Sequence, residues 1–336
     1  MSNRALFIAP CYYTGTSFER IFDGVTRVIE NNNLPIDTYV ISQYKNKLQR
    51  GELDDVKYIK AQARMLDDIA KSLIDGVYDR VLFIDFFNPG IDLLRYTSDK
   101  SGHSVKFASL LHGGSFVEGD IYEKGWVDKA EQLWASLYDR VYVPSEYALS
   151  QLPGFLSSTA KNFAWGLDAI NVPKTQKSFC DRKFDVVFPH RLNHDKGKDD
   201  LLYIVQKLKN ISFIITTPSP SLSGNEISEF NLPNVTMEYC ETTEDLQRIM
   251  DDSRLVLSCA KQELFGYSVA EAVLRGCIPI LPNSQVYPEM YDKNFLYDSL
   301  DDCCNLINYT LNNGDKNRMD YKKPSFLPML QDFLNI

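Results

Sequence analysis

Residues 255–288 read LVLSCAKQELFGYSVAEAVLRGCIPILPNSQVYP, and this stretch predicts the fold of the chain. An apolar strand is followed by a glutamate-bearing loop with one glycine, an amphipathic helix, a second apolar strand and a loop broken by proline. A strand, a helix and a second strand in close succession form a βαβ unit, whose strands are parallel. The stretch therefore predicts an α/β protein built on a parallel sheet.

Two glutamates of this stretch, Glu263 and Glu271, stand eight positions apart across the junction of loop and helix. A helix N-terminus offers unpaired N–H groups and the positive end of the helix dipole, and both favour a bound phosphate. A nucleotide-sugar would put its diphosphate on those amides, its sugar hydroxyls on Glu263 and its ribose on Glu271. We therefore expect a donor site here, to which Phe265, Gly266 and Tyr267 of the turn also contribute.

A second motif, FPHRLNHDKGKDDLL at 188–202, runs from an expected strand end into an expected helix. Arg191 and Lys196 would point towards the ligand, where two cations can neutralise a departing diphosphate. Taken alone, the motif fits a solvated basic loop equally well. Its combination with the two glutamates favours the phosphate-binding interpretation.

Apolar strand-like runs alternate with helical patterns along the chain. Strands are expected at 5–8, 38–41, 80–84, 106–111, 140–143, 185–188, 211–216, 234–238, 255–258 and 278–281, and the helices between them include 17–30, 63–74, 198–207 and 243–250. The alternation predicts two Rossmann-like domains, each with a doubly wound parallel sheet.

The expected domains are 1–170 and 183–318, joined by a polar linker at 170–182. The apolar tail 319–336 is expected to pack back on the first domain. Because open parallel sheets bind ligands at the carboxyl ends of their strands, we expect the two domains to face a central cleft.

The composition excludes several classes of protein. The chain has 336 residues and a formal net charge of −9, which argues mildly against a broad nucleic-acid footprint because nucleic-acid-binding domains are usually basic. No apolar run is long enough to span a membrane, and the N-terminus does not resemble a signal peptide. The seven cysteines form no CxxC pair and the four histidines show no zinc-ligand spacing, so we expect reduced thiols, a cytoplasmic location and no metal site.

In one segment, 44–64, aromatic residues are interspersed among basic ones, and this segment could still bind a nucleic-acid strand. Its basic residues are Lys45, Lys47, Arg50, Lys57, Lys60 and Arg64. Glu52, Asp54 and Asp55 dilute their charge, so an ordinary mixed surface is the alternative.

Strand ends of the first half carry further candidates. His112 ends one apolar strand and Asp85 another, and Gly113, Gly114 and Ser115 follow His112. The glycines let the backbone approach a ligand closely, so we place Asp85 and the Gly-Gly-Ser loop on the acceptor side. The alternatives are a buried histidine that caps its strand and, for Asp85, core packing at a strand end.

The motifs at 188–202 and 255–288 together resemble the donor-binding half of retaining GT-B glycosyltransferases of the family 4 type. The resemblance rests on Arg191, on Lys196 followed by glycine, and on Glu263-x-Phe-Gly with Glu271 further on. WGLDAI at 165–170 and DRVYVPSEYAL at 139–149 are similar to the end of that family's first domain. More narrowly, PHRLNHDK, AKQELFG and VYPE resemble the tRNA-queuosine mannosyltransferase family, whose F-H-E-N-Q strand end is L-H-G-G-S here.

The resemblance implies the GT-B fold, a nucleotide-sugar donor linked to GDP or UDP, and transfer with retention that needs no metal or other cofactor. Arg191 and Lys196 would stabilise the leaving diphosphate, and His112 would lie beside the transferred sugar. Further donor contacts would come from strand-end residues of both halves, namely Gly15, Thr16, Thr217 and Tyr239. An ordinary helix cap at Thr16 and a surface tyrosine at Tyr239 are the alternatives.

The acceptor stays open between two classes. One is a hydroxyl of a modified nucleoside in nucleic acid, either a hydroxymethylpyrimidine of DNA, which would have to leave the base stack, or a queuosine-like base of tRNA. The other is a glycan or a small molecule. A non-catalytic nucleotide-sugar-binding protein is a third interpretation, which the filled cationic and acidic positions of both motifs disfavour.

Overall fold

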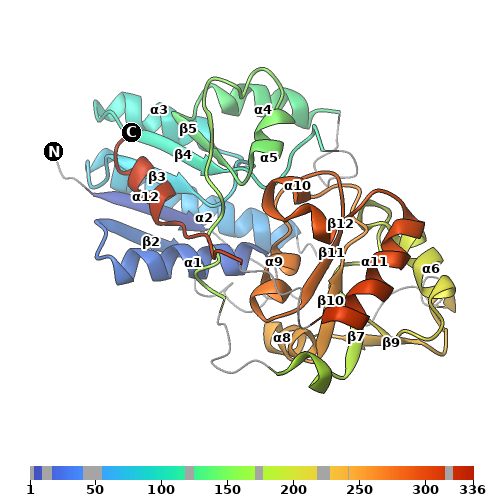
Figure 1. The fold of residues 1–336 in the computed structure, drawn as a ribbon. Coiled ribbons are helices and arrows are strands. Elements are labelled where there is room, and N and C mark those ends of the chain that lie inside the picture. The colour runs from blue at the N-terminus through green and yellow to red at the C-terminus, as the bar shows by residue number, and fades with distance from the viewer. Residues whose placement is uncertain are drawn as a thin grey trace. The chain divides into compact units, whose positions relative to one another are not determined.

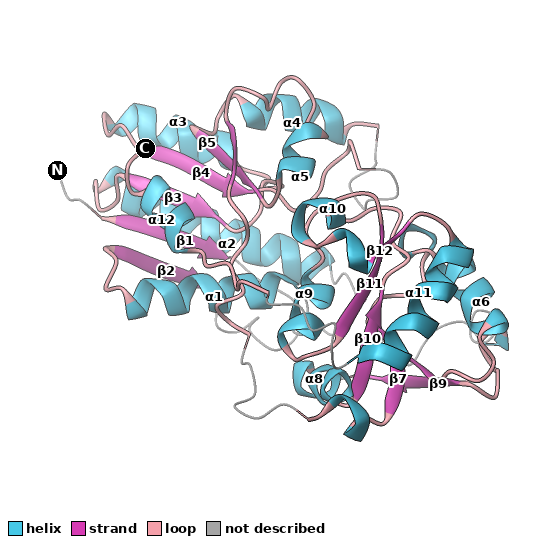
Figure 2. Ribbon diagram, in the orientation of Figure 1, coloured by secondary structure: helices cyan, strands magenta, loops and turns pink. Residues whose placement is uncertain are grey.

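The structure is a computed structural model, and it describes residues 4–9, 17–40, 55–117, 125–170, 177–217, 228–240, 242–314 and 321–336. The chain forms two compact units, Met1–Ile170 with Pro324–Ile336, and Asn171–Lys323. Within the described residues each unit contains a six-stranded parallel sheet flanked by helices (Figures 1 and 2). No helix among these residues is both long and apolar enough to cross a membrane.

The first unit is a doubly wound sheet with the strand order β2-β1-β3-β4-β5-β6. Its elements are β1 (Ala5–Ala9), α1 (Ser17–Asn31), β2 (Ile36–Val40), α2 (Asp55–Ile74), β3 (Arg80–Phe83), α3 (Ile91–Ser101), β4 (Lys106–Leu110), α4 (Val127–Ala135), β5 (Arg140–Val143), α5 (Glu146–Ser150), β6 (Ala160–Asn162) and α12 (Leu327–Phe333). Right-handed crossovers place α1 on one face and α2 and α3 on the other. Accordingly, α2 contacts α3, and α1 contacts the C-terminal α12.

The C-terminal segment completes the first unit. Asp168 of the WGLDAI motif accepts hydrogen bonds from Ser325 Oγ and Phe326 N, both at 2.9 Å. Tyr142 of β5 donates to Asp332 over 2.9 Å. Four apolar side chains of the segment are buried, namely Phe326, Met329, Leu330 and Phe333. Because apolar burial and polar anchoring coincide, the segment is an integral part of this unit.

The second unit has the strand order β12-β11-β10-β7-β8-β9. Its elements are η2 (Phe179–Asp181), β7 (Phe184–Phe188), η3 (His194–Lys196), α6 (Lys198–Lys207), β8 (Phe213–Thr217), β9 (Val235–Tyr239), α8 (Thr243–Asp251), β10 (Ser253–Leu257), α9 (Tyr267–Leu274), β11 (Ile278–Pro282), α10 (Tyr287–Met290), η4 (Lys293–Phe295), β12 (Leu296–Tyr297) and α11 (Leu300–Asn313). Helix α6 contacts α11, and helix α8 contacts α9.

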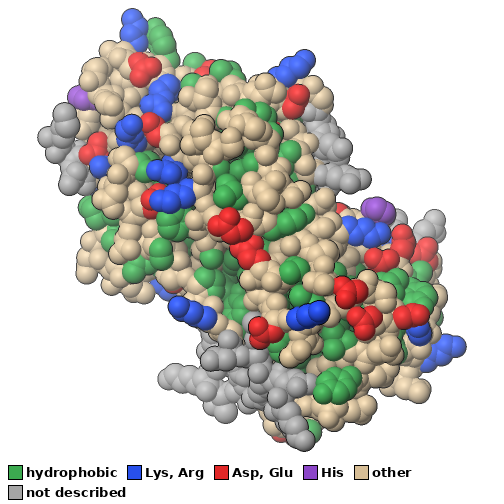
Figure 3. Space-filling view, turned by 45° about the horizontal axis from the view of Figure 1, so that its top comes forward, with side chains coloured by type: hydrophobic (Ala, Val, Ile, Leu, Met, Phe, Trp, Pro, Cys, Tyr) green, Lys and Arg blue, Asp and Glu red, His purple; other side chains and the backbone are tan. Residues whose placement is uncertain are grey.

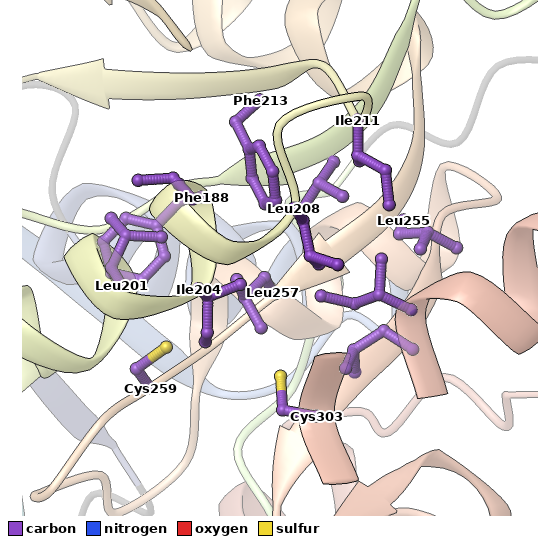
Figure 4. Packing of buried hydrophobic residues seen from close by; sticks show 14 of the residues in the cluster. Phe188, Leu201, Ile204, Leu208, Ile211, Phe213, Leu255, Leu257, Cys259 and Cys303 are labelled. Atoms are coloured by element: carbon purple, nitrogen blue, oxygen red, sulfur yellow. The ribbon is translucent and has the colours of Figure 1, made fainter. Parts of the chain in front are cut away.

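The core of the second unit follows the period of two that strands impose on side chains. Alternate strand residues join the apolar cluster beneath α6 and α11, namely Val186, Phe188, Phe213, Ile215, Leu255, Leu257, Ile278 and Ile280. Figure 4 shows Leu201 and Ile204 of α6, Leu208 directly after it and Cys303 of α11 within this cluster. The residues between, such as Val187 and Val256, are also fully buried. Burial of both faces explains why these strands read as continuous apolar runs.

Several sequence expectations need correction. Helix α2 begins at Asp55, eight positions before the expected start at 63, and the short edge strands β6 and β12 were not anticipated. The linker interpretation is wrong for the end of 170–182, because Phe179 (5% exposed) belongs to the core of the second unit. Arg182 is also buried there, and it donates to the carbonyl groups of Ser253 and Arg275.

Candidate functional site

The two motifs meet at the point where the strand order of the second sheet reverses. Strand β7 pairs with β8 on one side and with β10 on the other. The chain leaves β7 towards β8 and β9, and it later returns to add β10, β11 and β12 on the opposite side. A reversal of this kind leaves a crevice at the carboxyl ends of the strands, which is where ligands bind in open α/β sheets.

Lys196 and Glu263 come together across this point from the loops that follow β7 and β10. Lys196 Nζ donates to Glu263 Oε2 over 3.2 Å and to the Gln262 carbonyl over 2.8 Å. The side chains of Lys196 and Glu263 are only 16% and 18% exposed. A backbone hydrogen bond from Lys261 N to Asp195 O, 2.8 Å long, also joins the loops. The cation and the carboxylate are therefore held as one partly buried pair.

Glu263 is ionised at neutral pH. Burial raises its pKa, but the electrostatic interactions with Lys196 and His190 and the hydrogen bonds from Lys196 and the Gly266 N–H hold the pKa below its usual value. Gly266 N donates to Glu263 Oε1 over 2.9 Å. An ionised carboxylate only accepts hydrogen bonds, so it is suited to bind the hydroxyl groups of a sugar.

Two glycines at positive φ shape these loops. Gly197 (φ 73°) precedes α6, and a Cβ atom there would lie 2.1 Å from the Cys259 carbonyl oxygen. Gly266 (φ 79°) is the N-cap of α9. Its neighbours Phe265 and Tyr267 are only 3% and 7% exposed, and their rings contact each other. A ligand at this turn would therefore meet the backbone of these two residues rather than their rings.

Glu271 lies inside α9 and is fully buried. Its Oε1 accepts a hydrogen bond from Gln247 Nε2 of α8 over 2.8 Å. Gln247 could not be found from the sequence, because nothing in the pattern of α8 connects it with α9. The structure thus adds an amide neighbour to the glutamate that we assigned to the ribose.

The other second-unit candidates also lie at the carboxyl edge of the sheet. Arg191 is 53% exposed, and its Nη2 lies 4.0 Å from Asp195 Oδ2. Thr217 ends β8, and Tyr239, 43% exposed, ends β9. About half of the Arg191 side chain is therefore accessible to a phosphate ligand.

His112 of the first unit follows β4 and lies between two aromatic rings. Its ring centroid is 4.2 Å from that of Phe18 and 4.5 Å from that of Trp165. Its Nε2 lies 2.7 Å from the Ile84 carbonyl oxygen, and since a carbonyl only accepts, Nε2 carries the hydrogen. Burial lowers the pKa of His112 to about 4, although the hydrogen bond to Ile84 raises it. At neutral pH the imidazole is therefore neutral, with Nδ1 as a hydrogen-bond acceptor.

A pH dependence of stability follows from His112. Because its pKa is about 4 in the folded protein against an ordinary value of 6.5, the unfolded chain binds more protons between these limits. The free energy of unfolding should therefore fall as the pH is lowered from 6.5 towards 4. In His112→Gln, urea unfolding at about pH 7 and about pH 5 should show a smaller difference than in the unchanged protein. Equal differences in the two proteins would contradict the neutral assignment.

The Gly-Gly-Ser loop after His112 is organised around a buried glutamate of α4. Glu131, 1% exposed, accepts hydrogen bonds from the backbone N–H of Ser115 (2.9 Å) and from its hydroxyl group. A Cβ atom at Gly114 would lie 2.8 Å from Glu131 Oε1, so the missing side chain makes room for the carboxylate. Gly113 is buried in the same loop. The sequence pattern did not indicate a role for Glu131, because a glutamate in an amphipathic helix usually faces water.

The loop after β3 holds Asp85, which is half-buried and accepts a long hydrogen bond (3.4 Å) from Phe87 N. Phe86 is 1% exposed and contacts Tyr138 and Trp134, so its ring belongs to the core. Gly15 and Thr16 lie outside the described residues.

The basic segment is only partly described. Lys45, Lys47 and Arg50 lie outside the described residues, as does the side chain of Lys57. Lys60 and Arg64 are exposed on α2, and Arg64 Nε lies 3.7 Å from Asp68 Oδ2. On the face seen in Figure 3, basic side chains are interspersed with acidic ones.

Known proteins show similarity to both halves of the chain. No protein-family model matches it. A tRNA-queuosine alpha-mannosyltransferase of Drosophila melanogaster is 30% identical over 136 residues, which are 38% of this chain and 35% of that protein. The chain thus matches about a third of the length of this curated relative.

Solved structures resemble the chain over a greater length. HepE from Anabaena, in complex with UDP-glucose, has a TM-score of 0.63 and 14% identity over 99% of this chain and 98% of its own. TarM of S. aureus, in complex with UDP and other ligands, has a TM-score of 0.56 and 18% identity over 76% of this chain and 55% of its own. Together with the two doubly wound parallel sheets, these similarities show that the chain has the two-domain GT-B fold.

Proposed function

We propose that this protein is a glycosyltransferase that moves a sugar from a nucleotide diphosphate to an acceptor hydroxyl group. The observation that carries the proposal is the Lys196–Glu263 pair at the reversal point of the second sheet. In this pair, a lysine that can bind a diphosphate lies beside an ionised carboxylate that can bind the hydroxyl groups of a sugar. The similarity to a mannosyltransferase and to HepE in complex with UDP-glucose supports a nucleotide-sugar, with GDP or UDP as the nucleotide.

In the proposed reaction the bond between the anomeric carbon and the diphosphate oxygen breaks. Positive charge grows on the sugar and negative charge on the diphosphate. Lys196, Arg191 and the N-terminal amides of α9 stabilise the negative charge where it develops. Glu263 orients the sugar, and Glu271 binds the ribose.

The proposed transfer retains the configuration of the sugar. The acceptor oxygen forms its new bond on the face from which the diphosphate departs, and the departing phosphate oxygen takes the acceptor proton. This route balances all atoms and charges with no dedicated protein base, and it requires no metal ion or other cofactor. Asp85 and the loop of Gly113, Gly114 and Ser115 are the residues of the first unit that we assign to the acceptor.

For the acceptor we propose a hydroxyl group of a modified nucleoside in nucleic acid. The similarity to a tRNA-queuosine mannosyltransferase supports this class. Exposed Lys60 and Arg64 on α2 are the described contacts that it would use. A glycan or small-molecule acceptor is the second candidate, favoured by the mixed charge around Arg64 and by the net charge of −9.

A single experiment separates these functions. The protein is incubated with UDP- and GDP-linked sugars together with tRNA, hydroxymethylated DNA or simple glycans, and each product is weighed by mass spectrometry. Our proposal predicts a nucleic-acid product heavier by one sugar residue, and Lys60→Glu/Arg64→Glu should weaken its formation. A sugar on glycans alone would overturn the nucleic-acid assignment. Donor binding without transfer or hydrolysis on any acceptor would overturn the enzyme assignment.

A further inference from the structure

The VYPE segment after β11 has no role in the mechanism above, although two of its side chains are completely buried. Val286 and Tyr287 are both 0% exposed, and Tyr287 begins the short helix α10. A buried tyrosine on a turn at the carboxyl edge of the sheet needs a partner for its hydroxyl group. The hydrogen-bond partner of the Tyr287 hydroxyl group shows which part of the site the segment supports.

Tyr287 supports the start of the loop that carries Glu263. Its hydroxyl group donates to Ser258 Oγ over 2.8 Å. Ser258 is the first residue after β10, and its Oγ also accepts from Ala260 N over 3.2 Å. The Ser258 carbonyl accepts a further hydrogen bond, 2.9 Å long, from the Tyr297 hydroxyl group. The point at which the loop leaves the strand is thus held by hydrogen bonds from two buried tyrosines.

The ring of Tyr287 also supports the end of the same loop. A Cβ atom at Gly266 would lie 3.3 Å from Tyr287 Cε1 and 3.6 Å from Glu263 Cγ. The ring, the glycine and the stem of the glutamate therefore meet at one place. Tyr287 is in contact with both ends of the loop 258–266, while Lys196 and the Gly266 N–H hold the carboxylate itself.

The backbone before Tyr287 adopts an uncommon conformation to place it there. Gln285 has φ 59°, a left-handed value that is unfavourable for residues with a side chain. Asn283 N donates to the Tyr297 carbonyl over 2.8 Å, and Tyr287 N donates to the Ser284 carbonyl over 3.3 Å. Strained residues of this kind persist where the surrounding structure needs one particular turn.

We infer that Tyr287 is a positioning residue for Glu263: its hydroxyl group and ring set the two ends of loop 258–266 so that the carboxylate meets Lys196 and the donor sugar. The inference rests on the proposed function for its effect on turnover. The hydroxyl group acts at Ser258, at the end of the loop remote from α9, so binding of a nucleoside diphosphate without a sugar should depend little on this hydroxyl group.

The test compares Tyr287→Leu, which removes ring and hydroxyl, with two smaller changes. Tyr287→Phe removes only the hydrogen bond to Ser258, and Ser258→Ala removes this hydrogen bond together with the one from Ala260 N. Tyr142→Phe is the matched control, because it removes the hydrogen bond of a fully buried tyrosine hydroxyl in the other unit. For Tyr287→Leu we expect kcat to fall about 10- to 100-fold, as a small misplacement of a site residue does. Tyr287→Phe, which keeps the ring against Gly266, should lose less activity than Tyr287→Leu, and its Kd for UDP or GDP should change less than about threefold.

A second measurement does not depend on turnover. The pKa of Glu263, followed by carbon NMR of labelled glutamate, should rise towards its usual value in Tyr287→Leu and stay low in Tyr142→Phe. If neither the unchanged protein nor any variant transfers sugar, the proposed function fails. The NMR result alone then decides whether Tyr287 positions Glu263. An unaltered Glu263 pKa in Tyr287→Leu and in Ser258→Ala would overturn the inference. If Tyr287→Leu does not fold, the inference stands only if the pKa of Glu263 rises in Ser258→Ala. This rise should be smaller than the one expected for Tyr287→Leu.

Discussion

Lys196→Ala is expected to lower turnover about 10²- to 10³-fold, the usual loss when one group that stabilises developing negative charge is removed. Lys196 Nζ is a partly buried cation 3.2 Å from Glu263 Oε2, and its side chain is only 16% exposed. Arg191 lies further out and is 53% exposed, so it cannot replace a charge at that position. Steady-state kinetics with a nucleotide-sugar donor measure the effect, and circular dichroism checks that the variant is folded.

Lys198→Ala is the matched control for this prediction. Lys198 stands two positions further on, is 18% exposed, and forms an ion pair with Glu229 at 2.8 Å. The two substitutions therefore remove lysines of similar burial that each pair with a carboxylate, and Lys196 Nζ also lies 3.7 Å from Asp195 Oδ2. Lys196 donates to Gln262 and Glu263 of the loop after β10, whereas the ion pair of Lys198 is with Glu229. Turnover near normal in Lys196→Ala, or an equal loss in both variants, would contradict the assignment of Lys196 to the leaving diphosphate.

Gly197→Ala is expected to destabilise the protein by about 2–5 kcal/mol, from left-handed backbone strain and overpacking together. The added Cβ atom would lie 2.1 Å from the Cys259 carbonyl oxygen and 2.7 Å from Cys259 Cβ. Relief of this clash requires the loop with Lys196 to move away from β10. Turnover should therefore fall as well, by about 10²-fold. Urea unfolding and steady-state kinetics measure the two effects.

Gly102→Ala is the control that separates the effect of backbone strain from that of the steric clash at Gly197. Gly102 has φ 75° against 73° at Gly197, but nothing lies within 4 Å of a Cβ atom there. Backbone strain alone should cost about 1–2 kcal/mol and leave turnover unchanged. If the two alanine variants lost equal stability, the contact between Gly197 and Cys259 would not be the cause.

Much of the fold could be predicted from local pattern. Strand β5 and helix α6 lie where expected, at Arg140–Val143 and Lys198–Lys207, and the central strands of both sheets are displaced by one or two residues at most at each end. Strands buried on both faces read as apolar runs that stand out in the sequence. The edge strands β6 and β12 have three and two residues, too few for a recognisable period.

The candidate site could be predicted only in its residue types. Arg191, Lys196, Glu263 and Glu271 were found by motif, and whether they act as proposed stays a prediction. Supporting residues such as Gln247, Glu131 and Tyr287 were missed, because each acts through a contact with a residue distant in the sequence. A surface tyrosine and a buried one look alike in a sequence.

By itself the sequence determined the alternation of strands and helices, because apolar periodicity is a local property of the chain. Tertiary structure alone decided that Lys196 meets Glu263, 67 positions away, since this contact exists only because β7 and β10 pair in the sheet. It also decided the charge states of the candidate residues. The pKa of Glu263 is lowered and that of His112 falls to about 4. The shift of Glu263 comes from its neighbours in space and that of His112 from burial, neither of which the order of residues specifies.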